Sequence, residues 1–300
     1  YWGCPFFFLL SKILGIEEGT FDLAFSDPLT FGSLQHEALK ILLDPKGGVL
    51  PDVLAAGGGT AAVSSGGSLA AEACGGQPNP AACRMPNPVS GALLEAAEKA
   101  VSRAFGEWER SGKPRFIPPV WKAFRRLTVE RVVGLLETDA EEFPAHRVHA
   151  VEAFLEWTDP DTGVRFIGFI DRITERNGKY HLVDYKNSGY IKQGSIARAE
   201  GVLGSYQIPF YLLLAGKNGL DAEGASYFIL NEGKYNRFFD ADGGKAWFTP
   251  EETAALVNNA EASALLMARR IGEGRFETVI SDGCGSCAFR YVCRDRYVIR

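Results

Sequence analysis

The chain has 300 residues, of which 46% are hydrophobic and 23% are charged, as in globular proteins that bury a core. A net charge of −5 excludes a cationic nucleic-acid coat, though not a local basic groove. The apolar runs are too short to cross a bilayer and no signal peptide opens the chain, so we predict a cytoplasmic protein that is neither membrane-bound nor secreted. Because the sequence begins at Tyr1 and not at Met, we expect a segment of a longer protein.

Helical periodicity dominates the first half of the chain. The expected helices are Phe6–Ile16, which ends at Gly15, then Thr30–Leu43, Gly91–Arg110 and Val120–Glu137. His36 lies partly off the apolar face of the second helix. Residues 45–90 are rich in Gly, Ser, Pro and Asn, and we expect them to form a flexible insertion and not a domain.

The second half changes to the β-branched and aromatic pattern of strands. The expected strands are Arg147–Trp157, Val164–Ile173, Tyr180–Tyr185, Ala225–Leu230 and Tyr235–Phe239. Asn177-Gly178 predicts a hairpin turn between the second and third strands. Helices are expected from about Ser205 to Gly216 and from Glu251, capped by Thr249-Pro250, to Ile271. This order predicts an α/β core with a helical elaboration.

Six cysteines are present, and three of them are crowded together near the end of the chain. Cys284, Cys287 and Cys293 form the pattern C-x2-C-x5-C, in which the first two sulfurs can reach one metal centre from a single turn. Such a trio needs a fourth ligand, for which the other cysteines, Cys4, Cys74 and Cys83, are the candidates. The alternative interpretation is a loop of unpaired thiols.

The densest chemical signal lies in the expected strands. We predict that Asp171 ends the strand over Arg165–Ile170, and that Asp184 and Lys186 end the next strand across the hairpin. Two residues apart on a strand, Asp184 and Lys186 project from the same face. Two carboxylates and a carbonyl suit Mg²⁺ or Mn²⁺, and a nearby lysine can position an attacking water, as phosphodiester hydrolysis requires. The alternative is a set of strand ends that simply face water.

Four further polar residues are candidates for the same site. Gln207 and Tyr211 lie one turn apart on one face of the helix that follows the Lys186 strand. His36 lies on an early helix, and Glu152 lies in the strand before Asp171. A single histidine or glutamate in such a position is more often structural than a ligand.

Taken in order, the motifs resemble a known family. They are Cys-Pro-Phe at 4–6, Gly-Ser-Leu-Gln-His at 32–36, Gly-Phe-Ile-Asp-Arg-Ile at 168–173, Val-Asp-Tyr-Lys at 183–186, Gln-x3-Tyr at 207–211 and C-x2-C-x5-C at 284–293. The series is similar to the RecB-like branch of the PD-(D/E)xK nucleases, within it to the iron–sulfur subgroup of AddB-type helicase–nuclease subunits and the related CRISPR adaptation nucleases. Each motif alone is weak, but their order covers nearly the whole chain apart from the insertion.

The resemblance implies a role for each matching residue. The implied Mg²⁺ or Mn²⁺ ligands are His36, Asp171, Asp184 and the backbone carbonyl of Tyr185. Lys186 matches the catalytic lysine, and Gln207 and Tyr211 match a pair that lies beside the active site and contacts DNA. One departure is Asn187-Ser188-Gly189, where the family has Thr or Ser and then Gly directly after the lysine. No G-x4-G-K-[ST] motif occurs, so this chain carries no ATP-binding motor.

The resemblance also implies a ligand set for the cysteines. Cys4, Cys284, Cys287 and Cys293 would hold a [4Fe–4S] cluster, with Zn²⁺ as the alternative occupant. By analogy with a disulfide, closing so long a loop lowers the entropy of the denatured state. This loss would stabilise the folded state by about 5 kcal/mol. We therefore interpret the cluster as structural and not as redox-catalytic.

The implied fold is a restriction-endonuclease-like core, a mixed central sheet flanked by helices, with an N-terminal helical elaboration and a C-terminal cysteine-rich segment. We treat residues 1–300 as one nuclease domain. Its parts are N-terminal helices (1–44), the insertion (45–90), a helical part (91–140), the nuclease core (145–275) and the cysteine-rich segment (276–300).

The leading hypothesis is a metal-dependent deoxyribonuclease, an exonuclease that acts on single strands or DNA ends and works with a helicase partner in break repair and recombination. Arg172 and Arg290 are predicted to contact DNA, in a groove that would also use Lys192, Arg198, Arg294, Arg296 and Arg300. The alternative for the C-terminal arginines is a solvated tail. Two other functions remain open: an inactive nuclease fold that binds DNA or a partner, and a standalone nuclease of CRISPR adaptation.

Overall fold

The structure is a computed structural model. It describes residues 3–16, 28–50, 88–112, 117–144, 146–187, 191–196, 205–242, 244–280, 284–285 and 287–293. Most of the predicted insertion lies outside these residues, as do Cys74, Cys83, Arg198 and the arginines from Arg294 onward. Of the insertion's first residues, those up to 50 are described, and Val49 is buried against the helical layer. At its other end, a helix begins at Pro88, within the last residues of the predicted insertion.

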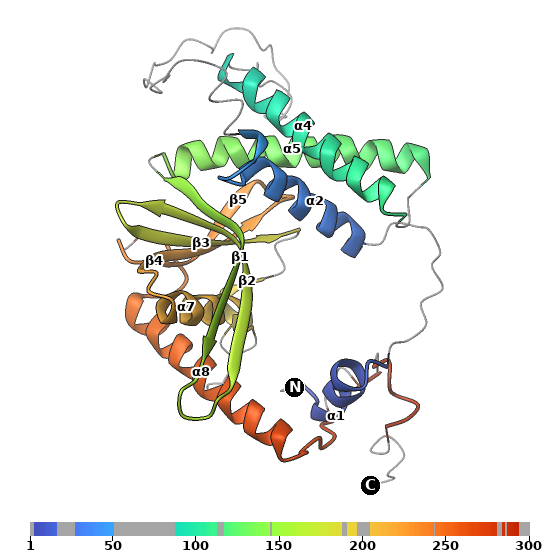
Figure 1. The fold of residues 1–300 in the computed structure, drawn as a ribbon, viewed down its shortest axis with the longest axis vertical. Coiled ribbons are helices and arrows are strands. Elements are labelled where there is room, and N and C mark those ends of the chain that lie inside the picture. Colours follow the sequence, from blue (N-terminus) through green and yellow to red (C-terminus); the bar gives the residue numbers. More distant parts are fainter. Residues whose placement is uncertain are drawn as a thin grey trace, which may run out of the picture.

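Helices and strands follow one another largely as predicted (Figure 1). They are α1 (Pro5–Phe8), the π-helical turn η1 (Leu9–Ile13), α2 (Pro28–Leu43), α4 (Pro88–Arg110), α5 (Pro118–Glu142), β1 (Arg147–Thr158), β2 (Arg165–Arg176), β3 (Lys179–Lys186), α6 (Gln193–Ile196), α7 (Gln207–Lys217), β4 (Ala222–Ile229), β5 (Lys234–Asp240) and α8 (Pro250–Gly272). The first predicted helix is instead an α-helical turn followed by a π-helical one. At the start of α8, Thr249 and Glu252 form a complete capping box.

The five strands form one mixed sheet in the order β1-β2-β3-β4-β5. The β3–β4 pair is parallel and the other pairs are antiparallel. A parallel pair needs a crossover connection, and α7 lies in the segment that joins β3 to β4. The predicted hairpin turn between β2 and β3 is confirmed, since Asn177 and Gly178 have φ angles of 55° and 78°.

Helices cover both faces of the sheet (Figure 1). On one face α2, α4 and α5 build a core with Val183 of β3 and Phe228 of β4. On the other face, α7 packs against Ile170 of β2 and Leu182 of β3, and α8 contacts α7 and β5. The predicted α/β class, a mixed sheet flanked by helices with an N-terminal helical part, is therefore confirmed. None of the helices in the described part of the chain is long and apolar enough to span a membrane.

Close packing of α7 on β2 depends on Gly168. A Cβ atom at Gly168 would lie 2.7 Å from Cδ1 of Leu214, a side chain that is itself fully buried. We therefore expect Gly168→Ala to lower the free energy of unfolding by about 1–3 kcal/mol through overpacking. Gly134→Ala, in the interior of α5 with open space around it, should instead raise the free energy of unfolding by about 0.5–1 kcal/mol. Urea denaturation of both variants checks this, and a Gly168→Ala protein as stable as the wild type would contradict it.

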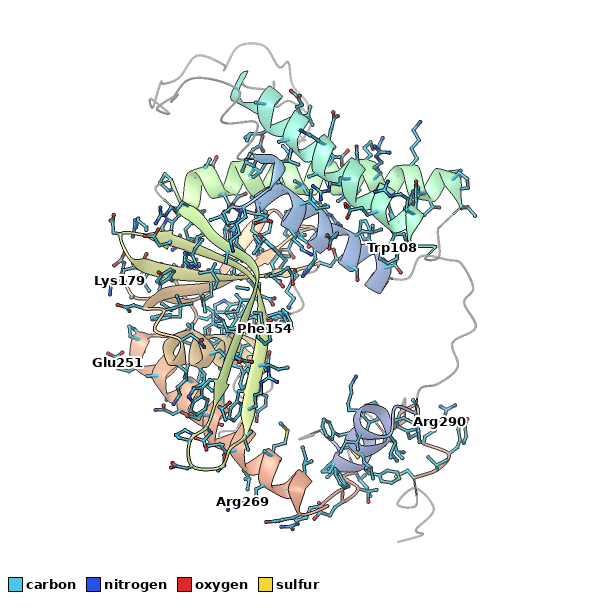
Figure 2. All side chains as sticks on the ribbon, viewed as in Figure 1. Trp108, Phe154, Lys179, Glu251, Arg269 and Arg290 are labelled. Atoms are coloured by element: carbon cyan, nitrogen blue, oxygen red, sulfur yellow. The ribbon has the colours of Figure 1, made fainter. Side chains whose placement is uncertain are left out.

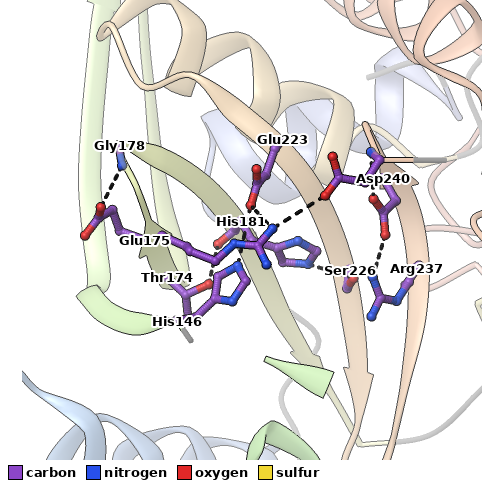
Figure 3. A network of polar contacts seen from close by, with 11 residues as sticks. His146, Thr174, Glu175, Gly178, His181, Glu223, Ser226, Arg237 and Asp240 are labelled. Atoms are coloured by element: carbon purple, nitrogen blue, oxygen red, sulfur yellow. Dashed lines mark hydrogen bonds and ion pairs between the residues drawn. The ribbon is translucent and has the colours of Figure 1, made fainter. Parts of the chain in front are cut away.

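A polar network surrounds the turn end of the β2–β3 hairpin (Figure 3). His181 is buried, with its Nε2 atom 2.9 Å from the hydroxyl of Ser226. Around it Arg176 pairs with Glu223, and Arg237 pairs with Asp240. Burial, reinforced by the nearby arginines Arg237 and Arg172, holds the pKa of His181 well below its ordinary value of 6.5. The network thus keeps a neutral imidazole in the core.

This buried histidine predicts a loss of stability in acid. Since its pKa is lower in the folded state, the unfolded chain binds the additional proton as the pH falls below about 6.5. The free energy of unfolding should then fall by up to about 1.4 kcal/mol per pH unit. We expect His181→Gln to remove this contribution. Between pH 6.5 and 5 the wild type should therefore lose more stability than the variant does. Parallel slopes for the two proteins would rule out this role for His181.

Candidate active site

Two carboxylates face each other across the β1–β2 ladder. The pairs Val151↔Arg172 and Ala153↔Ile170 place Glu152 level with Asp171. Glu152 has a φ angle of +46°, an uncommon conformation for a residue other than glycine. Such conformations persist where the surrounding structure holds them, and they cluster at functional sites.

The third carboxylate comes from β3. Pairing of β2 with β3 begins at Arg172↔Val183, so Asp171 and Asp184 lie just beyond the first pair. The backbone N–H of Tyr185 donates a 2.7 Å hydrogen bond to Oδ2 of Asp171 and ties the two strands together there. The prediction that Asp171 ends its strand was wrong, because β2 continues to Arg176. The ladder between β2 and β3 ends at Arg172, directly beside Asp171. Asp171 and Asp184 therefore still lie at the same end of this ladder.

An imidazole from the helical layer completes the group. Nδ1 of His36, on α2, lies 3.6 Å from Oδ1 of Asp171. His36, Glu152 and Asp171 each offer one ligand atom, and these three atoms lie within 4.8 Å of one another. The three residues come from α2, β1 and β2, so a metal-sized site joins the helical layer to the sheet. Glu152 is the residue that sequence reasoning left out of its ligand set.

The carboxylates of this group repel one another, and this repulsion shifts their pKa values. Burial, followed by the charge of Asp171, raises the pKa of Asp184 to about 6. The same two causes raise the pKa of Glu152 above its ordinary value. Burial lowers the pKa of His36, but the nearby Asp171, with Asp184 and Glu152, outweighs that effect and raises it. An excess of buried negative charge favours a bound cation.

Asp184 supports the same conclusion. Its side chain is 1% exposed, and its Oδ1 atom has no hydrogen-bond partner among the described residues. The ammonium of Lys186 forms an ion pair with the other oxygen, Oδ2. A buried carboxylate with unfilled acceptor positions, beside an imidazole and two more carboxylates, is a donor set that fits Mn²⁺ or Mg²⁺.

Lys186 is held from a second side by α7. Its Nζ donates a 2.8 Å hydrogen bond to Oε1 of Gln207, and Nε2 of Gln207 donates to the hydroxyl of Tyr211 at 3.1 Å. Burial raises the pKa of Tyr211, so its hydroxyl stays protonated at neutral pH. The structure thus brings the Gln-x3-Tyr pair to the lysine, where Gln207 fixes the direction of the ammonium.

Arg172 was predicted to contact DNA, but the structure contradicts this because its side chain is fully buried. Its guanidinium forms an ion pair with Asp139 of α5 and a hydrogen bond with the hydroxyl of Tyr235. A side chain enclosed in this way has no surface to offer a phosphate. Arg172 is a structural residue that links β2 to the helical layer.

The cysteine-rich segment lies next to the N-terminal turn, α1 (Figure 1). The rings of Phe7 and Phe289 pack edge to face with centroids 5.2 Å apart. Arg290 donates to the carbonyl of Gly285 at 3.3 Å, within the C-x2-C loop. The packing brings Cys4 and the C-terminal trio into one region, but no three of their sulfur atoms gather within 4.8 Å in the described part of the chain.

An imidazole and carboxylates that could hold a metal ion thus lie at a mixed sheet beside a lysine. The family model of the PD-(D/E)XK nuclease superfamily matches residues 1–294, and the chain belongs to this superfamily. Membership implies DNA as the substrate. A search of curated proteins found no match.

Proposed function

We propose that the protein is a metal-dependent deoxyribonuclease that hydrolyses phosphodiester bonds at the site formed by His36, Glu152 and Asp171. The observation that carries the proposal is the convergence of these three ligands within 4.8 Å, beside the Asp184–Lys186 ion pair. Asp184, and the backbone carbonyl of Tyr185, complete the proposed ligand set. Mg²⁺ or Mn²⁺ bound there would offset the negative charge that builds up on the scissile phosphate.

The chain's own residues supply orientation and proton handling. Lys186 is fixed by Asp184 and Gln207, so its ammonium can hold an attacking water or a phosphate oxygen in one direction. The nearby Asp171, with the negative charges of Asp184 and Glu152, raises the pKa of His36, and Asp171 holds the imidazole at the site. A fold that only binds DNA is less well supported, because the acids and the lysine are all present and Lys186 contacts both Asp184 and Gln207.

Metal binding and cleavage test the proposal together. Labelled single-stranded and duplex DNA should be cleaved with Mg²⁺ or Mn²⁺ and not with EDTA. Titration calorimetry with Mn²⁺ should show binding to the wild type that Glu152→Gln weakens strongly. Glu156→Gln, on the same strand but in an exposed ion pair with Arg165, is the matched control and should bind as the wild type does. Cleavage that persists in EDTA, or Glu152→Gln that binds Mn²⁺ normally, would overturn the proposal.

We further infer that the enzyme acts as an exonuclease within a larger helicase–nuclease, with Arg290 near the DNA path. The motif order that supports this inference is that of AddB-type subunits. End-labelled and circular single strands distinguish the modes, because an exonuclease leaves a circle intact. A standalone nuclease of CRISPR adaptation would be indicated by cleavage of linear DNA that a helicase subunit does not stimulate.

The same resemblance supports a [4Fe–4S] cluster held by Cys4, Cys284, Cys287 and Cys293. Four thiolates suit either this cluster or Zn²⁺, and the contact of Phe7 with Phe289 brings the two ligand segments together. Metal analysis of anaerobically purified protein should find iron, with a brown colour that Cys4→Ser removes. Stoichiometric zinc in place of iron would favour the alternative occupant.

A further inference from the structure

Beyond the acid cluster, β1 and β2 continue as a two-stranded hairpin whose inner face is part of the core. The rings of Trp157 and Phe166 stack there with centroids 5.3 Å apart, and α7 covers them through Phe210 and Leu214. This face needs no further partner. Figure 1 shows the hairpin reaching past the other strands of the sheet.

The outer face of the same hairpin carries exposed aromatic rings. Phe154 and Phe169 are ladder partners with ring centroids 5.1 Å apart, and they are 47% and 54% exposed. Ile167, two residues before Phe169, is 52% exposed. Nearer the hairpin tip, Glu156 and Arg165 form an ion pair on this face. The outer face therefore changes from charged at the tip to aromatic toward the acid cluster.

The aromatic pair is next to the acids along both strands. Phe154 follows Glu152 by two residues, and Phe169 precedes Asp171 by two residues, which is about 7 Å along a strand. Phe154 lies midway along the hairpin in Figure 2. A strand of DNA whose phosphate lies at the acids would thus have its neighbouring bases within reach of the two rings.

The exposed rings need an occupant with apolar faces. Large apolar side chains left in water next to a functional site mark a binding surface. Bases of a duplex are already paired and stacked on one another, whereas those of a single strand have free π-faces that stack on aromatic side chains. We propose that Phe154 and Phe169 form a stacking platform for the bases of single-stranded DNA beside the scissile phosphate. This inference rests on the proposed nuclease function.

Binding measured without cleavage tests the platform. In EDTA, fluorescence anisotropy with a labelled oligothymidylate should show the double variant Phe154→Ala/Phe169→Ala binding about 5- to 150-fold more weakly than the wild type. Phe169→Tyr keeps a ring and should retain the affinity of the wild type, whereas Phe169→Leu, apolar but without a π-face, should not. Leu266→Ala, which trims an exposed apolar side chain on α8, is the matched control and should bind normally.

A strand with abasic positions separates base stacking from other contacts. The wild type and the double variant should bind it equally, and both should bind a duplex equally. Unchanged affinity of the double variant for oligothymidylate would overturn the proposal, as would equal weakening on the abasic strand. An unchanged affinity of Phe169→Leu would also overturn the proposal, because it would show that an apolar side chain suffices and that no ring stacks on a base. Because none of these measurements requires cleavage, failure of the nuclease proposal would appear separately, as a lack of metal-dependent activity.

Discussion

Lys186→Met is expected to lower the rate of DNA cleavage by about 10²–10⁴-fold, the usual contribution of a positioned group that handles protons or charge at the reacting atoms. The ammonium is the one cationic group that contacts both Asp184 and Gln207 in the described part of the chain. Methionine preserves the length of the side chain and its packing against Tyr227, but it cannot donate a hydrogen bond. Single-turnover cleavage with saturating Mn²⁺ measures the effect on chemistry and not on metal binding.

The matched control for this variant is Lys179→Met. Lys179 is also on β3, but it is exposed and pairs with Asp221 at the far end of the strand. Its replacement should leave the cleavage rate unchanged. If Lys186→Met cleaves DNA within about threefold of the wild-type rate, Lys186 does not act in the reaction. Its ion pair would then serve only to compensate the buried charge of Asp184.

Asp171→Asn is expected to abolish Mn²⁺ binding and cleavage while it raises the stability of the metal-free protein. Asparagine retains a carbonyl oxygen that can accept the hydrogen bond from the N–H of Tyr185. It removes the negative charge that raises the pKa of Glu152 and of Asp184. The folded state therefore loses a repulsion that the unfolded chain does not have. Because the ion pair with a protonated His36 is lost too, the gain should be larger at pH 8 than at pH 6.

Thermal unfolding with and without Mn²⁺ measures both effects. In EDTA the melting temperature of Asp171→Asn should exceed that of the wild type, whereas Mn²⁺ should raise only the wild-type value. Asp161→Asn, in the exposed turn between β1 and β2, is the control and should respond to Mn²⁺ as the wild type does. A metal-free Asp171→Asn protein that melts below the wild type would mean that Asp171 serves the fold more than the metal.

Local patterns in the sequence predicted most of the architecture, because the helices and strands follow the expected order. Spacing along one strand predicts that Asp184 and Lys186 share a face, and they form an ion pair there. That Gln207 reaches Lys186 was implied only by the family resemblance. Glu152 was a candidate from the sequence, but it could not be recognised as a ligand in this way. Its position depends on a backbone conformation with φ of +46° and on the register with β2, and neither leaves a pattern in the sequence.

The error over Arg172 has a related cause. Arginine is usually a surface residue, and Arg172 was therefore assigned to a basic groove that contacts DNA. Whether it is buried depends on Asp139 and Tyr235, which are distant in sequence and reach Arg172 only once α5 and β5 are in place on the folded sheet. Alternation along a single strand does not reveal a charge partner on another element.

The separation of the active-site residues along the chain also bears on how the protein folds. The β1–β2–β3 meander consists of neighbouring segments joined by short turns, so these contacts can form early. The active site, in contrast, needs α2 from the first part of the chain and α7 from the connection that precedes β4. Forming such long-range contacts costs a large loop-closure entropy, and they are therefore expected to form last. Acquisition of Mn²⁺ affinity during refolding should therefore lag behind the appearance of secondary structure, and it would report the final docking of these helices.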